Sequence, residues 1–472
     1  MENIVHNIVD ILYAITIISV IFVIISENRN PVKSGAWILM LIFLPVVGLI
    51  LYFFIGQDFT KMHAYMRKKY DELDKGFLEK IEVMKEADYP KEYVNQINLL
   101  KNIQEVPLLG GNDLMFFSRA EDKFKQMFTD FEKAKKYIHL EYYAIGQDKL
   151  GNALKDLLIK KAKEGVEVRI IYDDWGCWRI RKGYFEEMRA AGIQVCTFSK
   201  VRIPLLTAKL NYRDHRKIAI IDGEIGYIGG MNATDRYIEG FKWGRWADTH
   251  CRVHGRGALE LLSVFFSNWY YLSREHIDLE KYYPVVGNFG NTSMQIVCSG
   301  PTSPEPEIMH GMTQAFYGAK KSIFVQTPYF IPPESMGDAL QAASIRGLDV
   351  RLMISKRSDL PLVQLASRSY IKEMLENGVK VYLYKEGFLH SKMMVIDGSL
   401  TLMGSANFDI RSFEENLEVE AFFYGEEAAA KPTKIFLDYQ KDCEQVTLEE
   451  WEKRPLLSRL AESVMRLLAP LL

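Results

Sequence analysis

Cysteine is scarce in this 472-residue chain, and its five positions follow no paired spacing. An odd number without C-x-x-C pairs excludes a cysteine-rich zinc site and argues against a disulfide framework. A reducing compartment is therefore favoured. The five residues are Cys177, Cys196, Cys251, Cys298 and Cys443.

An excess of charge of one sign is also missing. Lys plus Arg number 59 and Asp plus Glu number 61, which gives a formal net charge of −2. A general nucleic-acid binder would be strongly basic, so that class is disfavoured. The chain also has neither a P-loop nor the glycine pattern of a dinucleotide-binding turn. With 48% hydrophobic and 25% charged residues, the composition is that of a folded protein.

Long uncharged runs are present, and both lie near the N-terminus. Residues 11–25 carry no charge, and residues 36–55 form twenty consecutive uncharged positions, enough to cross a ~30 Å hydrocarbon core as a helix. A polar turn separates them. We predict a transmembrane hairpin in residues 1–57, with helices at about 8–25 and 36–55. Pro45 and Gly48 are compatible with a membrane helix.

The alternatives to a hairpin are a cleaved signal peptide and a buried core helix. A signal peptide would begin with a basic region, but this chain carries Glu2 and Asp10 there. Two basic residues lie in the turn and four follow the second run, which predicts a cytoplasmic body. They are Arg29 and Lys33 in the turn, and Lys61, Arg67, Lys68 and Lys69 after it.

The rest of the chain repeats itself. The run AKKYIHLEYYAI from Ala134 returns as AKKSIFVQTPYFI from Ala319, an offset of 185. Each run predicts a buried strand, followed by a helix over 150–163 or 335–345, a glycine and a second strand. A second helix and a third strand follow in each copy, from Ala191 and Asn377. This order predicts an α/β fold of two tandem repeats with mostly parallel or mixed sheets around one shared site.

The expected division of the chain follows from this repeat. A juxtamembrane connector would occupy residues 58–106, the first repeat 107–285 and the second repeat 286–472, which ends in an amphipathic helix.

One polar motif follows the third strand of each copy: H-x-K-x4-D-x6-G-[GS]-x-N. On a strand, residues two apart project from the same face, so His and Lys would point together into a cleft between the halves. Two lysines can neutralise a phosphodiester, one imidazole can attack phosphorus, and the other can protonate the leaving alkoxide. The motif residues are His215, Lys217, Asp222, Gly230 and Asn232, and His390, Lys392, Asp397, Ser405 and Asn407.

Both motifs resemble those of the phospholipase D superfamily, and the whole chain resembles the bacterial cardiolipin synthases within it. The supporting segments include LNYRDHRKIAIIDG, WADTH, TPYFIP and GSANFDIRSFEEN. The resemblance implies a catalytic set of His215, Lys217, Asp222, His390, Lys392 and Asp397.

It also implies that Asn232 and Asn407, with the lysines, hold the phosphate. Family members orient their histidines with acids downstream of each motif, and Asp248 and Glu418 are the candidates here; the alternative is that they are packing or solvated carboxylates. We expect His215 to attack and His390 to act as acid and base.

The implied reaction joins two phosphatidylglycerol molecules into cardiolipin and glycerol through a phosphohistidine, at the cell membrane and without metal or cofactor. Phosphatidylethanolamine could replace one substrate. The first alternative is a phospholipase D that passes the intermediate to water. A nuclease and an inactive scaffold for anionic lipid are further alternatives.

Two segments are candidates for contact with anionic membrane lipid. The first half has eleven more residues before its histidine than the second, and this insertion carries a basic rim around Leu205 and Leu206. The stretch from Leu456 to Leu472 places Arg459 and Arg466 among leucines, as in an interfacial helix. For both segments, packing against the body is the alternative.

Overall fold

The computed structural model describes residues 2–26, 31–52, 83–199, 212–275, 277–301, 303 and 305–469. The insertion around Leu205 and Leu206 lies outside the described residues, as do the basic residues 61–69. Of the expected connector, the structure describes the part from residue 83, which forms η2 (Glu86–Asp88), η3 (Lys91–Tyr93) and α5 (Val94–Gln104).

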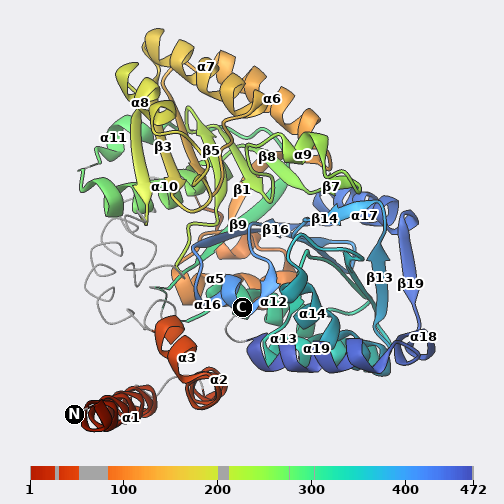
Figure 1. Cartoon of the computed structure of the whole chain (residues 1–472). Helices are drawn as coiled ribbons and strands as arrows, with labels where there is room; N and C mark the ends of the chain where they lie inside the picture. Colours follow the sequence, from red (N-terminus) through yellow and green to blue (C-terminus); the bar gives the residue numbers. More distant parts are fainter. Residues whose placement is uncertain are drawn as a thin grey trace.

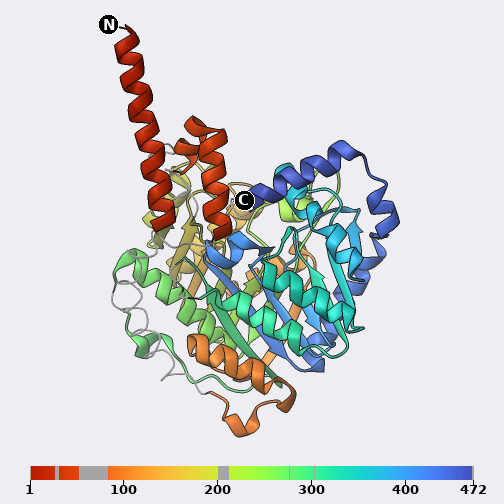
Figure 2. The same ribbon diagram turned by 90° about the horizontal axis from the view of Figure 1, so that it is seen from below.

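Three helices form the N-terminal segment. They are α1 (Glu2–Ser26), α2 (Pro31–Phe43) and α3 (Pro45–Leu51). The continuous helix expected over 36–55 is interrupted at Leu44, because Pro45 has no N–H to donate to the preceding turn and begins a new helix. In the described part of the chain, no helix is both long and apolar enough to cross a membrane. Figure 2 shows α1 projecting from the body.

One 15-stranded sheet runs through both halves of the body. The first half supplies β1 (Leu109–Phe117), β8 (His250–His254), β6 (Ile225–Gly229), β5 (Lys217–Ile221), β2 (Tyr137–Tyr142), β3 (Glu167–Asp173) and β4 (Gln194–Phe198), in that spatial order. The second half repeats the order with β9 (Thr292–Ser299), β18 (Glu418–Tyr424), β16 (Leu400–Gly404), β15 (Met393–Ile396), β10 (Ser322–Gln326), β12 (Asp349–Ser355) and β13 (Lys380–Tyr384), and β19 (Cys443–Val446) extends that edge. The halves meet where β1 pairs with β9.

The sheet is mixed, which agrees with the prediction of mostly parallel or mixed sheets. Four neighbouring strand pairs of this described sheet are parallel and ten are antiparallel. The parallel pairs are those that helices connect, as predicted. Two of the antiparallel pairs, β5–β6 and β15–β16, directly follow the His-x-Lys segments and are joined by tight turns.

The helices that cover one face differ between the halves. On this face α6 (Ala120–Lys133), α7 (Lys149–Lys163) and α8 (Gly183–Ala190) pack on the first half, whereas α5, α12 (Glu307–Gly318), α13 (Glu334–Ile345) and α15 (Ile371–Glu376) pack on the second (Figure 1). Helices α7 and α13 confirm the predicted helices over 150–163 and 335–345.

The opposite face carries one core that both halves share. It combines α10 (Gly257–Ser273) with α17 (Glu426–Lys441), and its buried residues include Phe265 and Phe436. The remaining helices are α9 (Arg236–Glu239), α11 (Leu279–Tyr282), α14 (Pro361–Ser369), α16 (Ile410–Glu414), α18 (Leu448–Glu452) and α19 (Leu456–Leu468).

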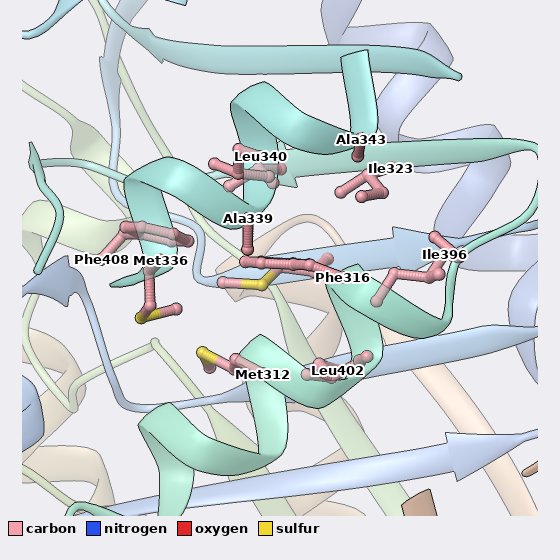
Figure 3. Packing of buried hydrophobic residues seen from close by; sticks show 14 of the residues in the cluster. Met312, Phe316, Ile323, Met336, Ala339, Leu340, Ala343, Ile396, Leu402 and Phe408 are labelled. Atoms are coloured by element: carbon pink, nitrogen blue, oxygen red, sulfur yellow. The ribbon is translucent and has the colours of Figure 1, made fainter. Parts of the chain in front are cut away.

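The apolar core under α12 and α13 in the second half fixes the hairpin that follows His390. Phe316 of α12 and Leu340 of α13 pack with Ile396 and Leu402 of the β15–β16 hairpin, and all four are buried (Figure 3). Phe408, just beyond this hairpin, joins the same cluster. The apolar contacts therefore hold the hairpin that begins directly after Lys392 against two helices.

Candidate active site

Each histidine of the repeated motif is held by the backbone of the opposite half. A parallel bridge joins Asp214 to Leu417, and the N–H of His215 donates to the carbonyl of Leu417 at 3.0 Å. In the other half, β14 (Gly387–Leu389) pairs with β7 (Arg245–Ala247), and the N–H of His390 donates to the carbonyl of Ala247 at 2.6 Å. Because Glu418 and Asp248 come directly after Leu417 and Ala247, each acid is placed beside the other half's histidine.

The carboxylates contact the imidazoles in a crossed arrangement. Nδ1 of His215 lies 2.9 Å from Oε1 and 3.1 Å from Oε2 of Glu418. Nδ1 of His390 lies 2.6 Å from Oδ2 of Asp248. An Nδ1–H that donates to a carboxylate leaves Nε2 with its lone pair. The structure thus brings both candidate acids to the histidines, and neither half contains a complete pair.

The two lysines are buried next to these histidines, but their contacts differ. Lys217 donates to the carbonyl of His215, and Lys392 donates to the carbonyl of His390 at 2.6 Å. Nζ of Lys392 also lies 2.9 Å from Nδ1 and 3.1 Å from Nε2 of the His390 ring. Within the described residues, no corresponding hydrogen bond reaches Nε2 of His215. Nε2 of His215 is therefore less engaged in hydrogen bonds than Nε2 of His390.

Burial shifts the protonation of the bases. It lowers the pKa of His215 to about 4 even though Glu418 acts in the opposite direction, and it lowers the pKa of His390 well below its usual value. Burial lowers the pKa of Lys217 to about 7, and the positive charge of Lys392 adds to this effect. Burial likewise lowers the pKa of Lys392 to about 8.

The two acids differ in charge state. Burial raises the pKa of Asp248 to about 7 against the opposing charge of Lys392. Burial also opposes ionisation of Glu418, but His215, Lys217 and a hydrogen bond from Ser405 outweigh it, and the pKa of Glu418 lies below its usual value. Only Glu418 is therefore firmly ionised at neutral pH.

Asp222 and Asp397 are not brought to the histidines, contrary to the expectation that they join the site. The carboxylate of Asp222 accepts from the N–H groups of residues 135, 136 and 137 at 2.8, 2.8 and 2.9 Å. Asp397 accepts in the same way from residues 320–322 at 2.8, 2.6 and 2.9 Å. Asp222 lies five positions after Lys217, which corresponds to roughly 16 Å of extended strand. Both aspartates therefore secure the far ends of the motif strands.

Comparisons with known proteins agree with this geometry. The family described as "Cardiolipin synthase, PLD-like domain" matches residues 127–242 and 312–439, and the family "Phospholipase_D-nuclease N-terminal" matches residues 11–57. The chain is 39% identical to the major cardiolipin synthase of Bacillus subtilis (strain 168), a match that covers 98% of both chains. It is 37% identical to the cardiolipin synthase of Geobacillus kaustophilus (strain HTA426), over 98% of this chain and 93% of that protein.

The chain belongs to the cardiolipin synthase family of the phospholipase D superfamily.

A solved structure shows the same fold. The phosphatidylserine synthase of Haemophilus influenzae Rd KW20 superposes with a TM-score of 0.64 at 13% identity, over 80% of this chain and 100% of that one. The paired phospholipase D-like halves of this cardiolipin synthase family member are thus seen in a solved protein as well.

The asparagines of the motif also differ between the halves. Asn232 is engaged internally: its Oδ1 accepts from the N–H of Ala144 at 3.1 Å, and its Nδ2 donates to the hydroxyl of Tyr237 at 2.7 Å. Oδ1 of Asn407 is buried and has no hydrogen-bond partner among the described residues. Asn407 is therefore the better placed of the two to contact a substrate.

The single difference inside the motif, Gly230 against Ser405, has a structural reason. The hydroxyl of Ser405 donates to Oε2 of Glu418. At Gly230, a Cβ atom would collide with the carboxylate of Asp248. The first motif therefore needs glycine so that Asp248 can reach His390, whereas the second uses its serine to support the charge of Glu418.

A buried polar network behind His215 was missed by sequence reasoning. Nδ2 of Asn268 donates to Glu141 at 2.9 Å and to Asp214 at 3.1 Å, and Arg216 lies 3.4 Å from Glu141. In the second half, Gln326 stands where the repeat offset places Glu141. There the hydroxyl of Ser391 donates to Gln326 at 3.1 Å. The repeat alignment contained this signal, since it pairs charged residues in one half with uncharged ones in the other.

Two further features complete the site. Aromatic rings flank the histidines: the Tyr143 ring lies 5.1 Å from that of His215, and the Trp246 ring lies 5.1 Å from that of His390. Over the residues that the structure describes, no group of three or more His, Cys, Asp and Glu is arranged to hold a metal ion. Lys217 and Lys392 are buried beside the two histidines.

Proposed function

We propose that this protein is a membrane-bound phosphatidyltransferase that makes cardiolipin and glycerol from two phosphatidylglycerol molecules through a phosphohistidine. The observation that carries the proposal is the crossed pairing of His215 with Glu418 and of His390 with Asp248 around two buried lysines. The membership in the cardiolipin synthase family supports the choice of substrate.

In the first step His215 attacks the phosphorus of phosphatidylglycerol. Its Nδ1–H is held by the ionised Glu418, and its Nε2 is directed at the substrate as the less engaged nitrogen. A P–N bond forms, and the bond from phosphorus to the oxygen of the headgroup glycerol breaks. His390 gives its proton to the departing glycerol oxygen, and glycerol leaves.

A bound substrate changes the protonation of the site residues. A phosphodiester brings a negative charge next to Lys217, Lys392 and His390, and an adjacent anion raises the pKa of cationic groups. The lysines then keep their charge at neutral pH, and His390 becomes able to carry the proton that it donates. Oδ1 of Asn407, which is buried without a partner among the described residues, accepts a hydrogen bond from a headgroup hydroxyl.

The second step reverses the roles. The hydroxyl of a second phosphatidylglycerol gives its proton to His390 and attacks the phosphorus. The P–N bond breaks, His215 is released, and the product is cardiolipin. One phosphodiester replaces another, so the exchange needs no nucleotide. If water resolved the intermediate instead, the product would be phosphatidic acid.

The proposed cellular location is the membrane, with the body on the cytoplasmic side. The apolar runs at 11–25 and 36–55 and the N-terminal family match at 11–57 support two membrane helices. Resistance of the protein to extraction by alkaline carbonate would be expected; complete release would contradict an integral hairpin.

A product analysis tests the function. The purified protein is incubated with detergent-dispersed phosphatidylglycerol and EDTA, and the lipids and free glycerol are quantified. We expect cardiolipin and glycerol in equal amounts, and none from the His215→Ala variant. Phosphatidic acid as the main product would identify a hydrolase, and loss of activity with EDTA would show a required metal.

A further inference from the structure

Helix α19 exposes a continuous apolar face. Its exposed side chains include Leu457 at 80%, Leu456 at 76% and Leu467 at 66%. Leu460 and Val464 complete the row and are also exposed. The spacing of these positions places them along one side of a helix. Such a row is more apolar surface than a solvated helix normally presents.

The opposite side of α19 is already used for packing. Met465 and Ala469 lie in a cluster with Ala366 of α14 and Ile331 of β11 (Phe330–Ile331). Glu462 is buried and pairs with Arg454 at 2.6 Å. The helix is therefore fixed to the body by one side, and the leucine row is left facing outward.

The surroundings of the leucine row favour a lipid bilayer as its occupant. Arg459 is exposed along one border of the row, where a long basic side chain can reach lipid phosphates, whereas the neighbouring Arg466 pairs with Glu373 at 2.9 Å. Figure 2 shows α19 on the same side of the body from which α1 projects, lying across the direction of α1. Ile18, Phe22 and Ile25 of α1 are exposed apolar residues as well.

We propose that α19 lies on the bilayer surface and inserts Leu456, Leu457, Leu460, Val464 and Leu467 into the boundary between headgroups and acyl chains. This inference rests on the proposed lipid function and adds a docking surface to it. An amphipathic helix in the membrane plane with a basic border is the arrangement by which peripheral proteins bind anionic lipid.

The position of α19 links docking to the site. Met465 and Ala469 at its C-terminal end share a cluster with Ile331 of β11, and β11 pairs with β17 (Phe408–Asp409), which begins directly after Asn407. A bilayer held by α19 would therefore lie near the second half-site.

Photolabelling of the full-length protein tests the docking. The protein is reconstituted in phosphatidylglycerol vesicles that contain a phosphatidylglycerol with a diazirine in its acyl chain, and adducts are mapped by mass spectrometry after irradiation. We expect adducts on the leucine row of α19 and on α1. Adducts on α1 without any on α19 would overturn the inference while leaving the membrane hairpin intact; adducts on neither would overturn both.

A variant set gives the functional readout. Leu457→Ser, Leu460→Ser and Leu467→Ser combined should lower activity on vesicles at least about fivefold, because apolar burial in the interface is lost. Activity on detergent-dispersed phosphatidylglycerol should stay within twofold of the wild type. The matched control combines Val285→Ser, Ile345→Ser and Leu437→Ser, which are exposed aliphatic residues on other elements, and should leave both assays unchanged.

Equal losses on vesicles and in detergent would show that the leucine row supports the fold and would overturn the inference. No loss in either assay would also overturn it. Capture of a protein on the row in place of lipid would have the same consequence. Absence of cardiolipin from the wild type in detergent would contradict the proposed function alone, since photolabelling does not depend on turnover.

Discussion

At the scale of single residues, the site depends on which atoms each carboxylate contacts. Glu418 and Asp248 belong to opposite halves from the histidines they hold, at 2.9 Å and 2.6 Å. Asp222 and Asp397 belong to the motif but contact backbone N–H groups far from the imidazoles. We therefore propose that the acids that act on the histidines are Glu418 and Asp248, which lie outside the repeated motif.

Removal of either orienting carboxylate should therefore lower activity without unfolding the protein. We expect Glu418→Gln and Asp248→Asn each to reduce kcat/KM about 10- to 100-fold, the equivalent of one charged hydrogen bond of ~1.5–3 kcal/mol. The control is Glu420→Gln, on the same strand. Burial raises the pKa of Glu420 well above its usual value, so a neutral amide is close to the native group and activity should be retained. Equal losses in all three variants would contradict the assignment.

Asp222 should behave as a structural residue. Asp222→Ala removes the acceptor of three N–H groups and should lower the free energy of unfolding by about 2–3 kcal/mol. The pH profile of the remaining activity should match that of the wild type. A displaced profile with unchanged stability would instead place Asp222 in the catalytic machinery.

At this scale the sequence predicted the histidines and lysines of the site but not which carboxylate contacts each histidine. The repeated H-x-K spacing identified residues that the fold brings together, although His215 and His390 lie just before the strands and not on them. The partner of each histidine could not be deduced, since both halves offer an acid at a similar place. Only the bridges Asp214–Leu417 and β7–β14 decide that the pairs cross.

At the scale of elements, the motif hairpins are rigid because helices pack over them. Leu402 of β16 is fully buried against α12 and α13, in the cluster of Figure 3. The alternation of apolar strands and amphipathic helices predicted α7 and α13 closely. It did not predict the antiparallel strands, because a buried strand has the same apolar pattern in either direction.

Truncation of this core should destabilise the second half. We expect Leu402→Ala to lower the free energy of unfolding by about 3 kcal/mol, the usual cost of a buried leucine cavity. Leu362→Ala on α14 is the control, because that side chain is 59% exposed and its loss should cost less than about 0.5 kcal/mol. Similar costs for both variants in denaturant titrations would be inconsistent with this core.

At the scale of the whole molecule, two halves with the same strand order form one site in which the two histidines have different surroundings. The sheet order repeats from β1 to β4 and from β9 to β13, yet Glu418 is ionised while the pKa of Asp248 is raised to about 7. Lys392 touches the His390 ring. The duplication supplies two histidines, and we propose that the difference between Gly230 and Ser405 helps to give them separate roles.

The different pKa values of the site residues should appear in the pH dependence of kcat/KM, which reports the ionisation of groups in the free enzyme. As pH falls, His215 is protonated near its pKa of about 4 and can no longer attack. As pH rises, Lys217 and Lys392 lose their charge near pKa values of about 7 and 8, and the phosphate loses its cations. We expect activity to decline at both limits when detergent-dispersed lipid is assayed from pH 4 to 9. A rate that stays constant up to pH 9 would contradict the role of the lysines.

The most direct test of the central claim is to trap the covalent intermediate. Phosphatidylglycerol labelled with phosphorus-32 is mixed with the wild type, His215→Ala and His390→Ala, the reactions are quenched under alkaline denaturing conditions, and the labelled peptide is sequenced. The account predicts label on His215 in the wild type and no label in His215→Ala. Label on His390, or turnover to cardiolipin without any labelled histidine, would contradict it.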